Sequence, residues 1–335
     1  MTTRRNSPSR SAARWPFLGQ ERLGYRLLAA LQADQLPPSV LFAGPAQLGK
    51  RSAARWLARF DRCLSAGRRP CDHCLSCRQL AVDQHPQVST LTANNDHPLR
   101  IDAIRQATRS FPFRLDPSER RWLIILHAEL MTESASNALL KFLEESPAGV
   151  MTVLTTNNLA QLPATIVSRS AVYFWHLVPP QKMITQLRLW LVERALPPTI
   201  RPADIIARAA GRPGLLHRLA QQPQVLIDEL ELLAVFFRAF VGREAAAIQS
   251  LLSEIDDRLN ENYFHLWELG LRELLLAKLN LTSRRLWPSW HDRLERYIED
   301  ISLAELLARS DRWLERFRLF HHHVAPRLVA ADLLA

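Results

Sequence analysis

Residues 39–60 constrain the fold most, because they join three elements in a fixed order. A short apolar run at residues 39–43 is typical of a buried strand, and a helix-compatible stretch covers residues 51–60. Between them lies Gly44-x-x-x-x-Gly49-Lys50. In such a turn the backbone N–H groups curl around phosphates, the helix N-terminus favours anions, and the lysine reaches the terminal phosphates. The sequence therefore predicts a phosphate loop in an α/β domain, with Gly44, Gly49 and Lys50 as the phosphate-binding residues.

Further apolar runs extend this pattern along the chain. Strand candidates lie at residues 122–126, 150–155 and 171–175, and helix candidates at residues 20–33, 101–110 and 134–145. Short apolar strands that alternate with helices are typical of a parallel sheet covered on both faces. The first part of the chain is therefore predicted to be a phosphate-loop NTPase-like α/β domain.

From residue 179 onward the strand signals end and helical patterns remain, at residues 181–196, 202–220 and 225–335. Prolines 197, 198 and 202 separate the first two of these. We therefore expect four parts: a disordered basic tail at residues 1–14, the α/β domain at 15–177, a small helical domain at 178–225 and an all-α domain at 226–335. The tail superficially resembles an organelle transit peptide but lacks an apolar face.

All four cysteines of the chain fall within fifteen residues, at Cys63, Cys71, Cys74 and Cys77. Two-residue gaps let thiolates converge from tight turns on a tetrahedral Zn²⁺. Four buried free thiols are the alternative, but the clustering favours a structural zinc module at residues 61–80. Four ligands close the coordination shell, so no catalytic role is expected for the metal.

The positive charge of the chain is confined to its first part. Residues 1–80 hold 14 Lys and Arg against 4 Asp and Glu, whereas residues 81–335 hold 29 of each. A local basic patch favours an anionic partner such as phosphate or nucleic acid, although a solvated basic face would have the same composition. No run of 18 apolar residues occurs, so we expect a cytoplasmic protein without a membrane span.

The phosphate loop lacks the residues that would bind magnesium. The residue after Lys50 is Arg51, where a hydroxyl is required for Mg²⁺, and Ser52 lies one position too far along. The next core strand ends in Leu126-His127-Ala128-Glu129 rather than in an Asp-Glu pair. Two independent defects predict that the chain does not hydrolyse ATP, while Lys50 and the loop amides leave ATP binding open.

Several motifs together resemble the AAA+ clamp-loader subunits of bacterial DNA polymerase III. They are Phe17-Leu-Gly-Gln-Glu21, the cysteine module after the loop helix, Asn137-Ala-Leu-Leu-Lys-Phe-Leu-Glu-Glu145, the segment from Leu162 to Ser168-Arg169-Ser170, and Gly211-Arg-Pro-Gly214. The resemblance covers about residues 15–225 and is only general beyond them. It implies an AAA+ domain followed by a helical lid and an all-α collar through which subunits associate.

Within that family the two defects resemble the delta-prime subunits rather than the gamma/tau ATPases. The resemblance implies a stator in the loader that places the sliding clamp on primed DNA, with gamma/tau and delta subunits as partners. It also implies that Arg169 is an arginine finger acting in trans on ATP held by a neighbouring subunit, with Ser170 in place of the motif's cysteine.

Two other functions remain open from the sequence. An active gamma/tau-like ATPase would need His127, Glu129 or Ser52 to restore magnesium binding. A zinc-dependent nucleic-acid-binding protein would use the basic first 80 residues, but it would leave the motif at residues 137–145 unexplained.

Overall fold

The computed structural model describes residues 15–94, 97–109, 111, 120–145, 149–191, 196–249, 261–281, 291–299 and 301–320. The predicted tail at residues 1–14 lies outside them. The chain divides into two compact units. The first comprises the residues up to Lys182 together with Arg212–Gly214, and the second comprises Met183–Gly211 and the residues from Leu215 onward. Whether the second unit divides again near residue 225 stays a prediction.

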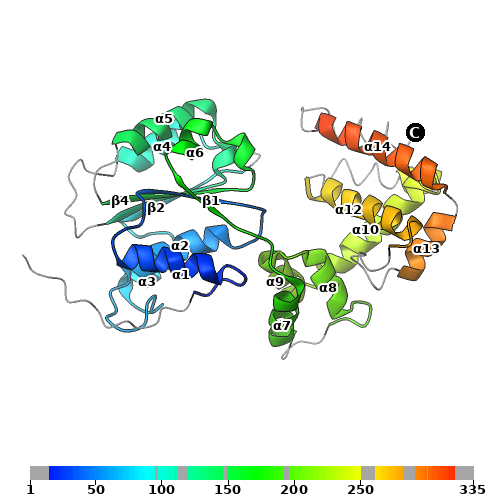
Figure 1. Cartoon of the computed structure of the whole chain (residues 1–335), viewed down its shortest axis with the longest axis horizontal. Coiled ribbons are helices and arrows are strands. Elements are labelled where there is room, and N and C mark those ends of the chain that lie inside the picture. The colour runs from blue at the N-terminus through cyan, green and yellow to red at the C-terminus, as the bar shows by residue number, and fades with distance from the viewer. Residues whose placement is uncertain are drawn as a thin grey trace, which may run out of the picture. The chain divides into compact units, whose positions relative to one another are not determined.

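A five-stranded parallel sheet forms the centre of the first unit (Figure 1). Its strands are β1 (Ser39–Ala43), β2 (Val88–Thr92), β3 (Arg121–Leu126), β4 (Val150–Thr156) and β5 (Ala171–Phe174). Their order across the sheet is β2-β3-β4-β1-β5, so that β1, β3 and β4 are internal strands. All residues of β1 and β4 are buried, as the continuous apolar runs predict.

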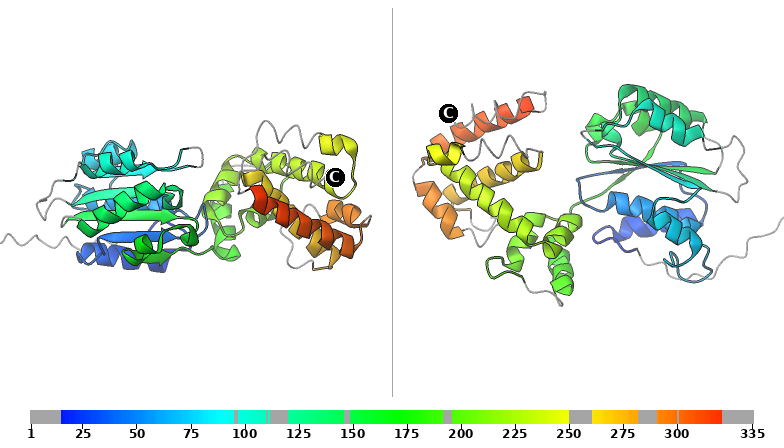
Figure 2. Two further views of the ribbon diagram at one scale, coloured as in Figure 1. Left: turned by 90° about the horizontal axis from the view of Figure 1, so that it is seen from above. Right: turned by 180° about the vertical axis from the view of Figure 1, so that it is seen from behind.

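Helices cover both faces of this sheet (Figure 2). On one face lie α1 (Glu21–Gln32), α2 (Lys50–Arg62) and α3 (Leu75–Ala81); on the other lie α4 (Ile101–Arg109), α5 (Glu133–Glu145) and α6 (Ala164–Ser168). Alternate strand residues supply the two cores: Phe42 and Ile124 pack toward α1 and α2, whereas Leu41 and Ile125 pack toward α4 and α5. The predicted doubly covered parallel sheet is thereby confirmed.

Strand β2 is absent from the sequence-based prediction. It lies at the edge of the sheet, and its five residues are only half-buried or exposed. An edge strand of this kind carries no continuous apolar run, so its sequence, Val-Ser-Thr-Leu-Thr, resembles a polar loop.

From Pro180 onward the described elements are all helical. They include α7 (Pro180–Leu191), α8 (Pro202–Ala209), α9 (Pro213–Gln221), α10 (Gln224–Phe240), α12 (Glu261–Lys278), α13 (His291–Glu299) and α14 (Leu303–Phe320). The single helix predicted over residues 202–220 is in fact α8 and α9. Ala210 and Gly211 adopt φ of 45° and 78° and end α8 in the left-handed conformation.

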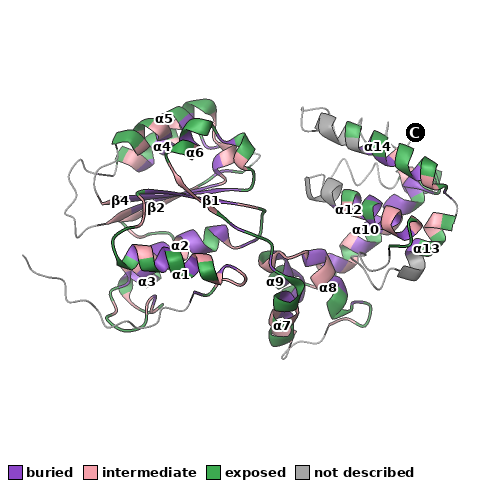
Figure 3. Ribbon diagram, viewed as in Figure 1, coloured by how far each residue is buried: buried purple, intermediate pink, exposed green. Residues whose placement is uncertain are grey.

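Buried residues recur along the last helices of the second unit (Figure 3), and aromatic side chains pack these helices together. Phe236 of α10 stacks on Trp267 of α12, with centroids 5.4 Å apart and ring planes 8° from parallel. Trp313 of α14 meets both rings edge-on at 5.2 Å and 5.4 Å. The arrangement joins three helices around one apolar core.

Candidate nucleotide site and cysteine cluster

The loop between β1 and α2 has the geometry that its glycines predict. Gly44 and Gly49 have φ of 145° and 94°, and Gly49 is the N-cap of α2. A Cβ on Gly44 would lie 2.3 Å from the carbonyl oxygen of Trp175, so that no larger residue fits there. Within the first unit, the Gly214 N–H donates a hydrogen bond to the Gln47 carbonyl oxygen at 2.9 Å.

Lys50 lies buried beside this loop, with 6% of its surface exposed. Its Nζ donates hydrogen bonds to the carbonyl oxygens of Gly44 at 2.5 Å and Pro45 at 2.6 Å, and to Asn157 Oδ1 at 3.0 Å. Burial lowers the pKa of Lys50 to about 8, against the opposing effect of the Glu129 charge. Protein oxygens thus accept hydrogen bonds from all three ammonium hydrogens.

The end of β3 lies in the same site and carries no metal-binding acid on its last residue. Leu126 is fully buried in the apolar core. His127 takes a left-handed conformation with φ of 56°, and its N–H donates to Thr155 Oγ1 at 3.2 Å. Arg51 and Ser52, in the first turn of α2, are both exposed.

Glu129 is the acidic residue that the structure brings to this site. Its side chain is 5% exposed, and its Oε1 accepts a hydrogen bond from the Asn157 N–H at 3.0 Å. Burial raises the pKa of the Glu129 carboxyl, but the His127 ring and the Asn157 N–H outweigh that effect and hold the pKa below its usual value. Oε2 is buried and has no hydrogen-bond partner. An ionised carboxylate therefore lies beside the phosphate loop.

Asn157 joins these groups, and the sequence alone assigns it no role. Besides its contacts with Lys50 and Glu129, its Nδ2 donates to His127 Nδ1 at 3.2 Å. The residue follows β4, and β1, β3 and β4 end at the same edge of the sheet because they are parallel. The polar residues after each predicted strand were the available signal for this grouping.

Arg169 lies away from the phosphate loop of its own chain. It follows α6 and precedes β5, and the next residue, Ser170, bonds through Oγ to Ser39 Oγ at 2.8 Å at the start of β1. Gly44 follows the other end of β1, about 16 Å away for five residues of strand. The Arg169 side chain is 41% exposed, and its guanidinium pairs with Glu144 at the end of α5.

The four cysteines converge as predicted. Cys63 ends α2 and Cys74 caps the N-terminus of α3, and the four Sγ atoms of the cluster all lie within 4.8 Å of one another. The Sγ of Cys71 accepts the Cys74 N–H at 3.3 Å, and the Sγ of Cys74 accepts the Cys77 N–H at 3.4 Å. Backbone donors of this kind stabilise thiolates, so the cluster could bind a metal such as zinc.

The thiols titrate unequally without a metal. For Cys74, burial raises the pKa, but the backbone N–H groups of Cys77 and Leu64 outweigh it and lower the pKa to about 6. Burial raises the pKa of Cys77 to about 12. A cation that binds all four sulfurs would therefore release protons as it binds.

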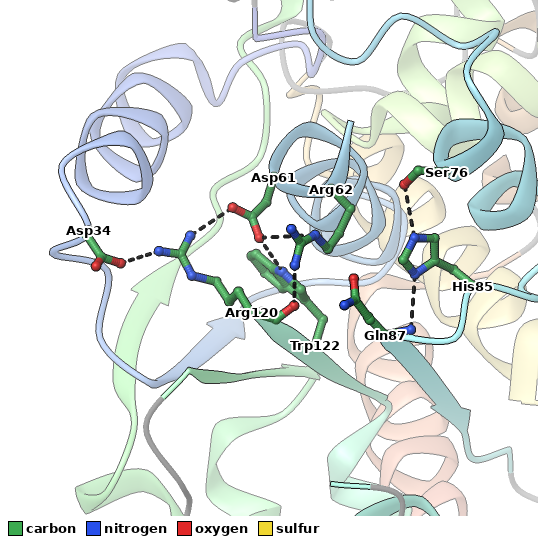
Figure 4. A network of polar contacts seen from close by, with 8 residues as sticks. All are labelled: Asp34, Asp61, Arg62, Ser76, His85, Gln87, Arg120 and Trp122. Atoms are coloured by element: carbon green, nitrogen blue, oxygen red, sulfur yellow. Dashed lines mark hydrogen bonds and ion pairs between the residues drawn. The ribbon is translucent and has the colours of Figure 1, made fainter. Parts of the chain in front are cut away.

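A polar network ties the cysteine cluster to the sheet (Figure 4). His85 Nδ1 accepts the Gln87 N–H at 3.1 Å, so in the neutral ring Nε2 donates to Ser76 Oγ at 3.0 Å, between two of the cysteines. At the end of α2, Asp61 accepts hydrogen bonds from Arg120 at 2.8 Å and from Trp122 Nε1 at 2.9 Å. The His85 contacts thus join α3 to the start of β2, and the Asp61 contacts join the end of α2 to the start of β3.

None of the helices that the structure describes is long and apolar enough to cross a membrane.

The comparison with protein families matches the first unit. Residues 19–176 match the family model described as "DNA polymerase III, delta subunit". DNA polymerase III subunit delta' of Bacillus subtilis is 34% identical over 150 residues, 45% of each chain, and that of Haemophilus influenzae is 29% identical over 184 residues, 55% of each chain. DNA polymerase III subunit gamma/tau of Mycobacterium tuberculosis is 31% identical over 167 residues, 50% of this chain and 29% of the relative.

The parallel sheet, the loop after β1 and the helices that follow define a phosphate-loop protein of the AAA+ class. Over residues 19–176 the chain is similar to the DNA polymerase III delta' subunits. The matched regions cover about half the length of these delta' relatives.

Proposed function

We propose that this chain is a clamp-loader subunit of the delta-prime type that hydrolyses no ATP itself. It acts as a stator in a complex with gamma/tau and delta subunits, and the complex places the sliding clamp on primed DNA. The lid at residues 178–225 and the collar at residues 226–335 belong to this proposal.

The end of β3 is the observation that supports the proposal most. A working site needs a carboxylate there to hold Mg²⁺ and a base to orient water. This chain has Leu126 in the core and His127 bonded to Asn157, and Arg51 cannot supply the hydroxyl that the loop lacks. The loop geometry is retained, so its residues fit a phosphate but not a metal–triphosphate complex.

The position of Arg169 supports a role in trans. Arg169 lies at the end of the sheet where β1 and β5 begin, whereas Gly44 and Lys50 follow the end of β1. An arginine side chain does not span that distance, so Arg169 cannot act on phosphates in its own loop. An exposed guanidinium at a sheet edge can stabilise charge on a phosphoryl group that a neighbouring subunit holds. Glu144 would hold Arg169 in place until that neighbour binds.

The cysteine cluster supports a structural zinc ion. Cys63, Cys71, Cys74 and Cys77 would supply four thiolates, which is the ligand set of closed zinc sites. When bound, the ion would hold the end of α2 and the start of α3 together, and His85 would link that module to β2.

An active gamma/tau-type ATPase is the second candidate, and the buried Glu129 carboxylate is the observation that favours it. Against it, Glu129 Oε1 already accepts the Asn157 N–H, and the charge of Glu129 acts on Lys50. Because the negative charge of Glu129 is balanced by the positive charge of Lys50, the pair has no net negative charge to attract Mg²⁺.

Reconstitution of the loader tests the proposed function. With gamma/tau and delta subunits of the same organism, the purified chain should complete a complex that loads the sliding clamp on primed DNA. We expect loading to fall to background when the chain is left out, and a Lys50→Ala variant to load as well as the unaltered chain. A chain that does not join the complex, or an assembly that loads equally well without it, would contradict the proposal.

A further inference from the structure

We propose that Glu129 is an internal counter-anion of the phosphate loop. Its negative charge balances the positive charge of Lys50 and thereby disfavours the binding of nucleoside triphosphates. The inference rests on the proposed absence of magnesium chemistry at this site. It adds a residue that determines which anions the loop accepts.

Protein atoms accept all the hydrogen bonds that the Lys50 ammonium can donate. Lys50 is buried, and Gly44, Pro45 and Asn157 accept its three hydrogen bonds. A phosphate that enters the loop must break at least one of these bonds to reach the ammonium. Since burial disfavours an ammonium, a negative charge nearby stabilises the protonated form of Lys50 in the nucleotide-free protein.

Glu129 supplies that charge. Its side chain is 5% exposed. Asn157 bridges the two groups, because its backbone N–H donates to Glu129 Oε1 and its Oδ1 accepts a hydrogen bond from Lys50. Glu129 Oε2 is also buried and has no hydrogen-bond partner. The Glu129 charge favours the protonated form of Lys50, against the effect of burial on the Lys50 pKa.

The negative charge of Glu129 affects which ligands the phosphate loop can bind. In a working NTPase the acid beside the loop binds Mg²⁺, and the metal then attracts the phosphates. Here no hydroxyl or strand-end acid completes a metal site, so the negative charge of Glu129 repels the phosphate oxygens instead. Like charges at short range inside a protein repel each other more strongly than they do in water. The loop should therefore bind ATP weakly although its glycines retain the correct conformation.

Titration of ATP into the full chain tests this inference. The experiment compares the unaltered protein with Glu129→Gln in buffer without magnesium, and it omits chelators, which would remove a metal from the cysteines. We expect Glu129→Gln to tighten the dissociation constant for ATP about tenfold or more, because the glutamine keeps the size and the Asn157 contact but loses the charge. Glu133→Gln, an exposed acid on α5, is the matched control and should leave the affinity unchanged.

Glu129→Ala provides a second variant if the glutamine disturbs folding, and thermal unfolding of each protein verifies its structure. An unchanged or weaker affinity in folded Glu129→Gln and Glu129→Ala would overturn the inference. A loss of affinity would mean that Glu129 assists binding instead. These outcomes are distinct from failure of the proposed function, because the loader assay does not require ATP in this loop.

Discussion

Replacing Arg169 with alanine is expected to slow ATP hydrolysis at the neighbouring site that it serves by about 10³-fold, while the loader still assembles. A finger arginine stabilises the charge that develops on the transferred phosphoryl group, and its loss typically costs 10³ to 10⁵ in rate. Arg169→Lys should recover little, since an ammonium lacks the planar donors that contact two oxygens at once. Single-turnover hydrolysis by the assembled loader measures the effect, and gel filtration verifies assembly.

Arg105→Ala is the matched control, because Arg105 is an exposed arginine on α4 in the same unit. It should leave both assembly and hydrolysis unchanged. Equal hydrolysis rates at every site in the Arg169→Ala and unaltered loaders would refute the finger assignment. The same assignment would also fail if Arg169→Ala prevented assembly altogether, because the residue would then be an interface contact.

Replacing Cys77 with serine is expected to remove zinc and to lower the free energy of unfolding of the α/β unit by about 3 kcal/mol or more. Cys77 is fully buried in the cluster, and binding of a structural zinc ion contributes directly to folding free energy. Metal analysis of the purified protein and chemical denaturation measure the two effects.

Leu64→Ser is the control for this prediction. Leu64 follows Cys63 but is 70% exposed, so the variant introduces the same residue beside the cluster without removing a ligand. It should keep its zinc and its stability. If Cys77→Ser kept full zinc content, or if the unaltered protein contained none after purification without chelators, the cluster would not be a zinc site.

Local patterns predicted much of the α/β unit. The spacing from Gly44 to Lys50 and the apolar run before it define one turn of the chain and need no distant partner. The convergence of the four cysteines was also predicted correctly, because their close spacing in the sequence already indicates it. Strand β2 was missed, since an edge strand buries too little surface to need an apolar sequence.

The contacts between distant residues could not be predicted in the same way. Asn157 and Glu129 lie 28 positions apart and meet only because β3 and β4 end at one edge of the sheet. Glu129 follows the end of β3 by three residues, and it lies in the short helical turn after His127, where its carboxylate meets Asn157 beside Lys50. The pairing of Arg169 with Glu144 likewise depends on how α5 and α6 pack.

ATP turnover by the purified full chain with magnesium tests most directly whether this subunit depends on a neighbour for hydrolysis. The account predicts a rate equal to that of the Lys50→Ala variant, since the loop has no groups to hold the metal and activate water. A rate of about 1 s⁻¹ or faster that disappears in Lys50→Ala would contradict it.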